Sequence, residues 1–413
     1  MIVKKGKLYL NIGFLYTHPP GESMGSINRV RFLCDGLVKL HHNCFILTSF
    51  SGFKEWNPKI KFINISDVLL KKNISKKIYQ ILRWILNLKY FSNFTLTNPF
   101  ILNNIIKKLS NDLVRTTRNL AYKLDVIIGE QELAGLVLIQ KKEELNCPII
   151  INYHNYWPEE LVEHNIIHRS GKKYKYLVNL EKKLINKGDL IITNGESLRD
   201  FLIKTLKIKN INKIVSISNG ATPILTEPKK KSLPPKIINA GMVVHRSNIK
   251  LFLNSIPFIL KEYPNSQIYI TRKGEKLKDI MKLNKKMNLK INFYWKDTHK
   301  EFLHFLSECN VGVVTSSNSI PRKIGFPSKI LDYLSVGVPV VGNDIGGWTS
   351  IIEEKKVGLL SSNNPKDLAN KIIELIKNSE YNYKCGQNAI NLMKNEYNIQ
   401  NSVSKLLEYI KKI

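Results

Sequence analysis

Short apolar runs alternate with amphipathic stretches along the first half of the chain. The first run, at 8–14, precedes a loop at 16–26 and a stretch whose apolar residues recur at helical spacing from Ile27 to Leu40. Later runs are apolar at nearly every position, which is typical of strands buried on both faces of a parallel sheet. The runs that predict strands are 8–14, 44–48, 126–129, 148–153, 190–193 and 214–218.

The same alternation restarts in the second half, after a polar, basic and proline-bearing stretch at 226–235 that predicts a linker. The strands predicted beyond it are 236–240, 267–271, 290–294, 311–315 and 339–342, with helices near 247–263, 275–287, 300–308 and 328–336. The pattern therefore predicts an α/β protein with two doubly wound, Rossmann-like domains, at 1–225 and 236–395. A final helix at 396–413 is expected to return to the first domain.

The net charge of the chain predicts that its surface attracts anions. The 413 residues include 64 Lys and Arg against 33 Asp and Glu, a formal net charge of +31, which attracts nucleic acid, acidic lipid head groups or phosphorylated substrates. Five scattered cysteines without a CxxC pair predict neither a disulfide scaffold nor a zinc site, and therefore a cytoplasmic location. No run approaches the roughly 18 apolar residues of a spanning helix, and the run at 8–14 lacks a signal-peptide cleavage pattern.

One stretch of the first domain, 73–124, is basic, aromatic and rich in asparagine. Its apolar residues from Ile78 to Leu88 form one helical stripe, with lysines, Trp84 and Phe91 at its margins. Two interpretations fit this stretch: a helix at the water–lipid boundary, or an amphipathic helix packed on the first domain with a solvated basic face. The net charge favours peripheral contact with an anionic membrane, on the inner face of the plasma membrane.

The strongest chemical signal lies at 324–342, which predicts a loop, a helix beginning near Ser328 and a buried strand. Ser328 is a good N-cap residue, and the backbone N–H groups after it would form an anion site for phosphate. Lys329 adds a mobile positive charge, and Asp332, one turn later, places a carboxylate where ribose hydroxyls could donate to it. In the next loop, Gly346-Gly347 would let the backbone approach a ligand closely.

This stretch resembles the donor-site signature of the GT-B glycosyltransferases, in particular retaining family 4 of the glycosyl transferases group 1. The family has two acidic residues separated by seven positions, then a Gly-Pro-Val-Val strand and a Gly-Gly loop. Asp332 occupies the second acidic position, which binds the nucleotide ribose in the family, whereas Ile324 stands at the first. Pro327, Ser328 and Lys329 match the Pro-Ser-Lys turn of similar subfamilies. The resemblance implies two Rossmann-like domains facing a central cleft, with the donor in the second domain and the acceptor in the first.

Other parts of nearly the whole chain resemble the family in the same order. Loop 18–26 is similar to the glycine-rich loop that faces the diphosphate and acceptor, and His154 ends a strand whose family histidine lies near the donor sugar. Loop 241–248 lies where the family has its diphosphate clamp, a Gly-Arg pair with a downstream Lys, but neither basic residue is in its usual place and Arg246 is taken as the substitute. The stretch 294–297 lies at the base-contact loop. The residues so implied are, as catalytic, His154 and Glu22, and, as substrate-binding, Gly25, Arg246, Trp295, Lys296, Pro327, Ser328, Lys329, Asp332, Gly346 and Gly347.

Several of these residues also have a purely structural interpretation. His154 could be a satisfied histidine that caps a strand, and its place in the family order is what favours a site. Arg246 could be a solvated charge at a helix start, and Trp295 a packing residue. Glu22 and Glu159 could each serve as a base or acceptor contact, but loop carboxylates usually face solvent.

The resemblance implies transfer of a sugar from a nucleotide-sugar donor, by default a UDP-sugar, to a glycan or lipid-linked acceptor in cell-surface polysaccharide or lipopolysaccharide biosynthesis. Backbone N–H groups, a helix N-terminus and a basic side chain can neutralise the departing diphosphate, and the sequence has no DxD-type dyad in a suitable loop. Transfer is therefore expected to proceed with retention and without a metal or cofactor.

Three alternatives to sugar transfer stay open. A sugar-nucleotide epimerase would use the same fold, and Ile324 keeps open an inactive paralogue. A nucleic-acid-binding protein would explain the charge, but the sequence contains no recognisable recognition helix, RNA-binding aromatic signature or zinc module. No nucleic-acid partner is therefore expected.

Overall fold

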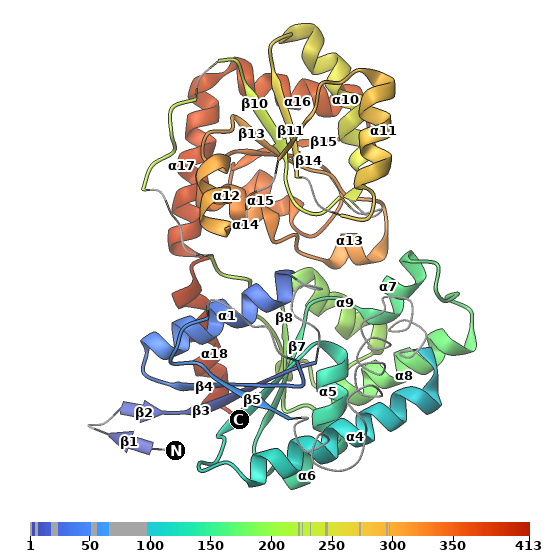
Figure 1. Ribbon diagram of the computed structural model, residues 1–413, viewed down its shortest axis with the longest axis vertical. Coiled ribbons are helices and arrows are strands. Elements are labelled where there is room, and N and C mark those ends of the chain that lie inside the picture. Colours follow the sequence, from blue (N-terminus) through green and yellow to red (C-terminus); the bar gives the residue numbers. More distant parts are fainter. Residues whose placement is uncertain are drawn as a thin grey trace, which may run out of the picture. The chain divides into compact units, whose positions relative to one another are not determined.

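The apolar runs form the strands of two parallel sheets in the structure of this protein, a computed structural model (Figure 1). The structure describes residues 2–4, 7–17, 24–50, 56–65, 97–221, 224, 226–231, 233–243, 247–271, 274–294, 296 and 298–413. The chain divides into two compact units: Met1–Ser218 together with Ser402–Ile413, and Asn219–Asn401. Each unit contains one of the two sheets.

The first unit is built on a seven-stranded parallel sheet with the order β5-β4-β3-β6-β7-β8-β9. Its strands are β3 (Asn11–Tyr16), β4 (Asn43–Thr48), β5 (Lys61–Asn64), β6 (Val126–Glu130), β7 (Ile149–Tyr153), β8 (Leu190–Thr193) and β9 (Ile214–Ser216). Every residue of β3, β6, β7 and β8 is buried, as expected for strands covered on both faces. The strand order reverses between β3 and β6, and the carboxyl ends of these strands form the switch point where doubly wound sheets bind ligands.

Helices surround this sheet (Figure 1). They are α1 (Met24–Lys39), α4 (Pro99–Arg118), α5 (Gln131–Gln140), α6 (Lys142–Leu145), α7 (Trp157–Glu163), α8 (Lys172–Lys187) and α9 (Glu196–Leu206), with a 3₁₀ turn η2 (Ile211–Lys213). The last helix, α18 (Ile399–Ile410), belongs to this unit from Ser402 onward, and the Ser402 hydroxyl donates to Ser218 O at 3.0 Å. Two short strands, β1 (Ile2–Lys4) and β2 (Lys7–Tyr9), pair antiparallel.

Helix α4 forms the carboxyl-terminal part of the basic insert predicted at 73–124. The Asn98 side chain caps it by accepting from the N–H groups of Phe100 and Ile101, and Pro99 fills its first turn. The buried face of α4 includes Leu102 and packs on α5. In this part the insert is an amphipathic helix packed on the first unit. The stripe between 78 and 88 lies outside the described residues.

The second unit repeats the design with a six-stranded parallel sheet, in the order β12-β11-β10-β13-β14-β15. Its strands are β10 (Lys236–Asn239), β11 (Gln267–Thr271), β12 (Asn292–Tyr294), β13 (Val311–Val314), β14 (Val340–Asn343) and β15 (Gly358–Ser361). The order reverses between β10 and β13, which places the switch point of this sheet at their carboxyl ends. The stretch 226–235, predicted as a linker, lies inside this unit, where Lys231 donates to Ser307 O at 2.9 Å.

Two apolar clusters cover the faces of the second sheet. One cluster draws on α10 (Ile249–Glu262), α11 (Leu277–Met287) and α16 (Pro365–Lys377). The other draws on α12 (His299–Leu306), α14 (Lys329–Ser335), α15 (Thr349–Glu354) and α17 (Ser379–Asn395). A short helix, α13 (Ile320–Ile324), follows β13. The apolar pattern missed β5, β15 and α13, which are short and lie at sheet edges or in a loop.

Within the described ranges, no helix combines the length and the apolar character needed to cross a membrane.

Candidate functional site

Helix α14 is anchored on the switch point of the second sheet by Tyr333. The Tyr333 ring covers Gly312 of β13, where a Cβ would lie 2.6 Å from the ring. Its hydroxyl accepts from the N–H of Ala240 at 2.7 Å and donates to Ile238 O at 3.1 Å, just at the end of β10. Because Tyr333 is fully buried, these bonds fix α14 beside the carboxyl ends of β10 and β13.

Lys329, the first residue of α14, lies against the loop that follows β10. Its Nζ donates to Ala240 O at 3.2 Å, and its Cδ would be 3.5 Å from a Cβ at Gly241. Gly241 has φ +95°, a conformation that side chains disfavour. Burial, and then repulsion from Arg322, lower the pKa of Lys329 to about 8. The structure thus places a partly desolvated cation at the switch point, as an anion site requires.

Asp332 lies one turn after Lys329 and pairs with a histidine that the sequence analysis did not single out. Nε2 of His299 is 2.9 Å from Oδ1 of Asp332, and the two side chains are 46% and 25% exposed. Thr298 caps α12 by accepting from the N–H of Glu301, which fixes His299 in the first turn. The Asp332 carboxylate is therefore held on one side by His299 and accessible from another. The capping pattern Thr298-x-x-Glu301 was the signal for this helix start.

Ser328 lies at the predicted N-cap position of α14, but its side chain does not cap the helix. Ser328 has helical dihedrals (φ −56°, ψ −28°) and its side chain makes no capping hydrogen bond. The N–H groups of Ile330 and Leu331 donate to Pro327 O and Ser328 O, at 3.1 and 3.0 Å. Because Pro327 and Ser328 continue the helical turn backward, these two N–H groups are satisfied within the protein. The cationic part of the site therefore rests on Lys329 rather than on the first turn of α14.

The Gly346-Gly347 pair has a packing role that the sequence did not reveal. Gly346 has φ +127°, and a Cβ there would lie 2.5 Å from Nε1 of the fully buried Trp348. The N–H of Gly347 donates to Lys323 O at 2.8 Å, which ties this loop to α13. The Gly347 N–H is therefore already paired within the protein, and the close approach of a ligand to Gly346-Gly347 stays a prediction.

A network of asparagines fixes the loops around the same sheet edge. The Asn343 side chain, buried at the end of β14, accepts from Ser316 N at 2.8 Å and donates to Ser316 O at 2.9 Å. It also donates to Asn363, whose Oδ1 accepts from Asn248 at the start of α10. These bonds hold the turn after β13, which leads into α13. Ile324, at the end of α13, is buried, so the first acidic position of the family signature is filled by a packing residue.

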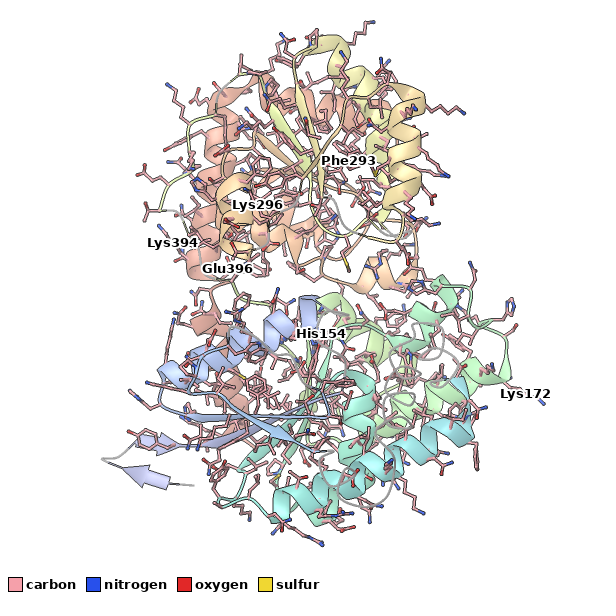
Figure 2. The ribbon with its side chains drawn as sticks, viewed as in Figure 1. His154, Lys172, Phe293, Lys296, Lys394 and Glu396 are labelled. Carbon is pink, nitrogen blue, oxygen red and sulfur yellow. The ribbon has the colours of Figure 1, made fainter. Side chains whose placement is uncertain are left out.

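The first unit holds a second polar cluster, at the carboxyl ends of β6 and β7. Nε2 of His154 is 3.0 Å from Oε2 of Glu130, and Nδ2 of Asn152 donates to both Glu130 oxygens at 3.0 and 2.9 Å. Glu130 is fully buried and His154 is 7% exposed. Figure 2 labels His154 in the first unit. His154 was predicted from the sequence, whereas Glu130 and Asn152 were not. Their signal was the polar end of two apolar strands.

Glu159 is not available as a base. Its carboxylate accepts from Nε and Nη2 of Arg169 at 2.9 and 2.5 Å and from the Tyr174 hydroxyl at 2.7 Å. With only 2% of its surface exposed, it holds α7 to the chain that leads into α8.

The remaining predicted residues are placed only in part. Glu22, Arg246 and Trp295 lie outside the described residues, and Gly25 lies in the first turn of α1. Lys296, labelled in Figure 2, follows β12. Its Nζ lies 5.9 Å from the centroid of the Tyr294 ring. Among the described residues, no group of three or more His, Cys, Asp or Glu side chains is arranged to hold a metal ion.

Two family models match successive parts of the chain. The model described as Glycosyltransferase Family 4 matches residues 25–223, and the model described as Glycosyl transferases group 1 matches residues 223–392. The chain is a glycosyltransferase of group 1. Both polar clusters thus lie within the matched residues of this glycosyltransferase.

Two relatives are themselves uncharacterized glycosyltransferases. One, from Methanocaldococcus jannaschii, is 26% identical over 62% of this chain and 66% of its own length. The other, from Haemophilus influenzae, is 22% identical over 83% of this chain and 93% of its own length.

Solved structures with the GT-B fold align with this glycosyltransferase over nearly its whole length. Sucrose-phosphate synthase from Thermosynechococcus elongatus aligns with a TM-score of 0.70 and 16% identity, covering 98% of both chains. Anabaena HepE in complex with UDP and glucose aligns with a TM-score of 0.67 and 13% identity, covering 98% of this chain and 100% of HepE. WaaG, a glycosyltransferase involved in lipopolysaccharide biosynthesis, aligns with a TM-score of 0.65 and 10% identity, covering 97% of this chain and 99% of WaaG. These likenesses establish the two-domain, Rossmann-like GT-B fold.

Proposed function

We propose that this glycosyltransferase binds a nucleotide-sugar donor, by default a UDP-sugar, at the switch point of its second sheet. The observation that carries the proposal is the placement of Lys329 against the end of β10 with Asp332 one turn later. Lys329 would neutralise the diphosphate, and Asp332, held by His299, would accept from the ribose hydroxyls. That HepE was solved with UDP supports the choice of nucleotide.

The sugar would then pass to a glycan or lipid-linked acceptor in cell-surface polysaccharide or lipopolysaccharide biosynthesis, with retention of configuration and without a metal. A lysine that stabilises the leaving diphosphate supplies the charge that a metal ion would otherwise supply. His154, at the end of β7, would contact the donor sugar. The resemblance to WaaG supports a surface-glycan acceptor.

The basic, exposed face of α4 supports peripheral contact with an anionic membrane. It carries Lys107, Lys108, Arg115 and Arg118, and the Phe100 side chain near its start is 77% exposed. An amphipathic helix with basic residues and an exposed aromatic is typical of segments that lie on acidic lipid. A lipid-linked acceptor would be reached at such a surface.

A thermal-shift panel of nucleotide sugars tests donor binding. A ligand at 100 times its Kd should stabilise the wild type by about 2.7 kcal/mol, a rise in Tm of roughly 5–10 °C for a domain of this size. Asp332→Ala and Lys329→Ala should each weaken binding about 10- to 100-fold, because each removes a charged hydrogen-bonding group. Lys323→Ala, which removes an exposed lysine six residues earlier, is the matched control and should bind as the wild type does.

The outcome that contradicts the proposal is a wild-type protein that no nucleoside diphosphate sugar stabilises. Equal binding by the wild type and both site variants would instead mean that the donor does not bind at α14. Release of free sugar and nucleotide without an acceptor requirement would favour the epimerase alternative over transfer.

A further inference from the structure

Glu130 is a buried carboxylate with a full set of partners at the end of β6. It has no exposed surface, and both of its oxygens accept from Nδ2 of Asn152 on the neighbouring strand β7. Its Oε2 also meets Nε2 of His154 at 3.0 Å. A buried charge is tolerated only when it is paired and hydrogen-bonded. Asn152 and His154 supply the hydrogen-bonding partners of Glu130, and a cation on α1 supplies the opposite charge.

The cation is Arg29, which is 5% exposed. Burial lowers the pKa of Arg29 to about 10, while attraction to Glu130 works in the opposite direction. At neutral pH the guanidinium therefore stays charged, and it is attracted to the Glu130 carboxylate. The Arg29 Nη2 donates to Ile217 O at 2.8 Å, so this charge is fixed in place by the chain after β9.

An ionised carboxylate can only accept hydrogen bonds. The contact between Glu130 and Nε2 of His154 therefore requires a proton on Nε2. The His154 backbone is held as well, because its carbonyl accepts from Nδ2 of Asn194 at 3.1 Å. Ring and backbone are thus both oriented by buried groups.

We infer that Glu130 is a positioning residue, which fixes His154 as the Nε2–H tautomer and leaves Nδ1 as the acceptor for a hydroxyl of the donor sugar. This inference rests on the proposed role of His154 in donor binding. A partner that sets the tautomer of a histidine determines which ring nitrogen can accept from a substrate. Glu130 itself is buried behind the ring and acts through it.

The tautomer can be measured directly in the ligand-free protein. The ring nitrogens of ¹⁵N-histidine-labelled enzyme are observed by long-range proton–nitrogen correlation at pH 7.5, and His154→Asn assigns the His154 signals. We expect a protonated nitrogen at Nε2 and an unprotonated one at Nδ1. In Glu130→Gln the amide can donate as well as accept, so the Nε2–H preference should be lost. Glu159→Gln, the same change at a buried glutamate bound to Arg169, should leave the His154 signals unchanged.

Turnover supplies the second readout. With UDP-glucose as the probe, Glu130→Gln should lower kcat for UDP release at least tenfold and change the KM for the donor less than threefold, whereas Glu130→Asp, which keeps the carboxylate, should recover part of the loss. A wild-type His154 that carries its proton on Nδ1 overturns the inference, even if no variant folds. A Glu130→Gln protein with wild-type tautomer and kcat overturns it as well. If the wild type binds no nucleotide sugar, the proposed function fails, but the tautomer still decides whether Glu130 controls His154.

Discussion

Lys329 is held against a backbone carbonyl at the end of β10, and this setting controls its charge. Its Nζ donates to Ala240 O, while burial and Arg322 lower its pKa to about 8. A lysine of lowered pKa loses its proton as the pH rises through 8, well below the range of an exposed lysine. An anion that binds at Lys329 needs the protonated form, so its affinity should be nearly constant up to about pH 7 and fall as the pH rises through 8.

This dependence on pH gives a prediction for UDP binding. Between pH 7 and pH 8.5 the Kd of UDP, measured by titration calorimetry, should rise roughly fourfold, as the protonated fraction of a group with a pKa of about 8 falls. Lys329→Met should bind more weakly at pH 7 and lose this dependence. A wild-type Kd that stays constant over this interval would show that Lys329 does not bind the diphosphate.

At the scale of elements, the position of α14 depends on the packing of its Tyr333 ring against Gly312 of β13. The Tyr333 ring packs directly on Gly312, and its hydroxyl bonds both the N–H of Ala240 and the carbonyl of Ile238. Lys329 and Asp332 stand on the same helix, so any displacement of Tyr333 moves both of them. The site geometry is therefore set by the packing of α14 on β10 and β13.

Gly312→Ala tests this packing. The new Cβ would lie 2.6 Å from the Tyr333 ring, so the ring or the strand must shift. This strain should lower the free energy of unfolding by about 1–3 kcal/mol. It should also weaken UDP binding, because α14 shifts. The control is Gly195→Ala, where nothing lies within 4 Å of the new Cβ and the expected cost is below about 1 kcal/mol. Denaturant unfolding of the two variants decides: equal stability would mean that α14 does not depend on this contact.

At the scale of the whole molecule, the net charge of +31 is the property that would attract the protein to an anionic membrane. Attraction between a basic surface and acidic lipid is screened by salt, with a Debye length of about 10 Å at 0.1 M. The exposed lysines of α4 are one part of that charge, on the unit that holds His154. Membrane contact through α4 should therefore depend on both the lipid charge and these lysines.

Vesicle flotation checks this proposal. The full-length protein should float with vesicles containing phosphatidylglycerol at 0.1 M NaCl, and less at 0.5 M or with phosphatidylcholine alone. Lys107→Glu with Lys108→Glu on α4 should reduce flotation by more than half. Lys278→Glu with Lys282→Glu on α11, an equal change of charge on exposed lysines of the other unit, should reduce it less. Equal losses from both pairs would mean that only the total charge matters.

The strands, the α/β class and the Lys329–Asp332 spacing were predictable because each depends on local periodicity. Buried strands such as β6 and β7 are apolar at most positions, and two residues three apart on a helix share a face in any context. The glycosyltransferase family and the GT-B fold were predicted from motifs of this local kind, such as the stretch around Asp332, and the family models and solved structures confirmed both. The capping role of Ser328 was misjudged because a capping side chain usually needs extended backbone dihedrals, whereas Ser328 has helical ones.

The sequence by itself thus determined most of the strands and helices and the family of the chain, since those features depend on neighbours along the chain. Only the tertiary structure decided that Glu130 meets His154, 24 residues later, and that His299 meets Asp332, 33 residues later. Those pairs exist because β6 lies beside β7 and α12 packs near α14. Strand order and helix packing follow from burial of the whole core, which no local pattern of residues specifies.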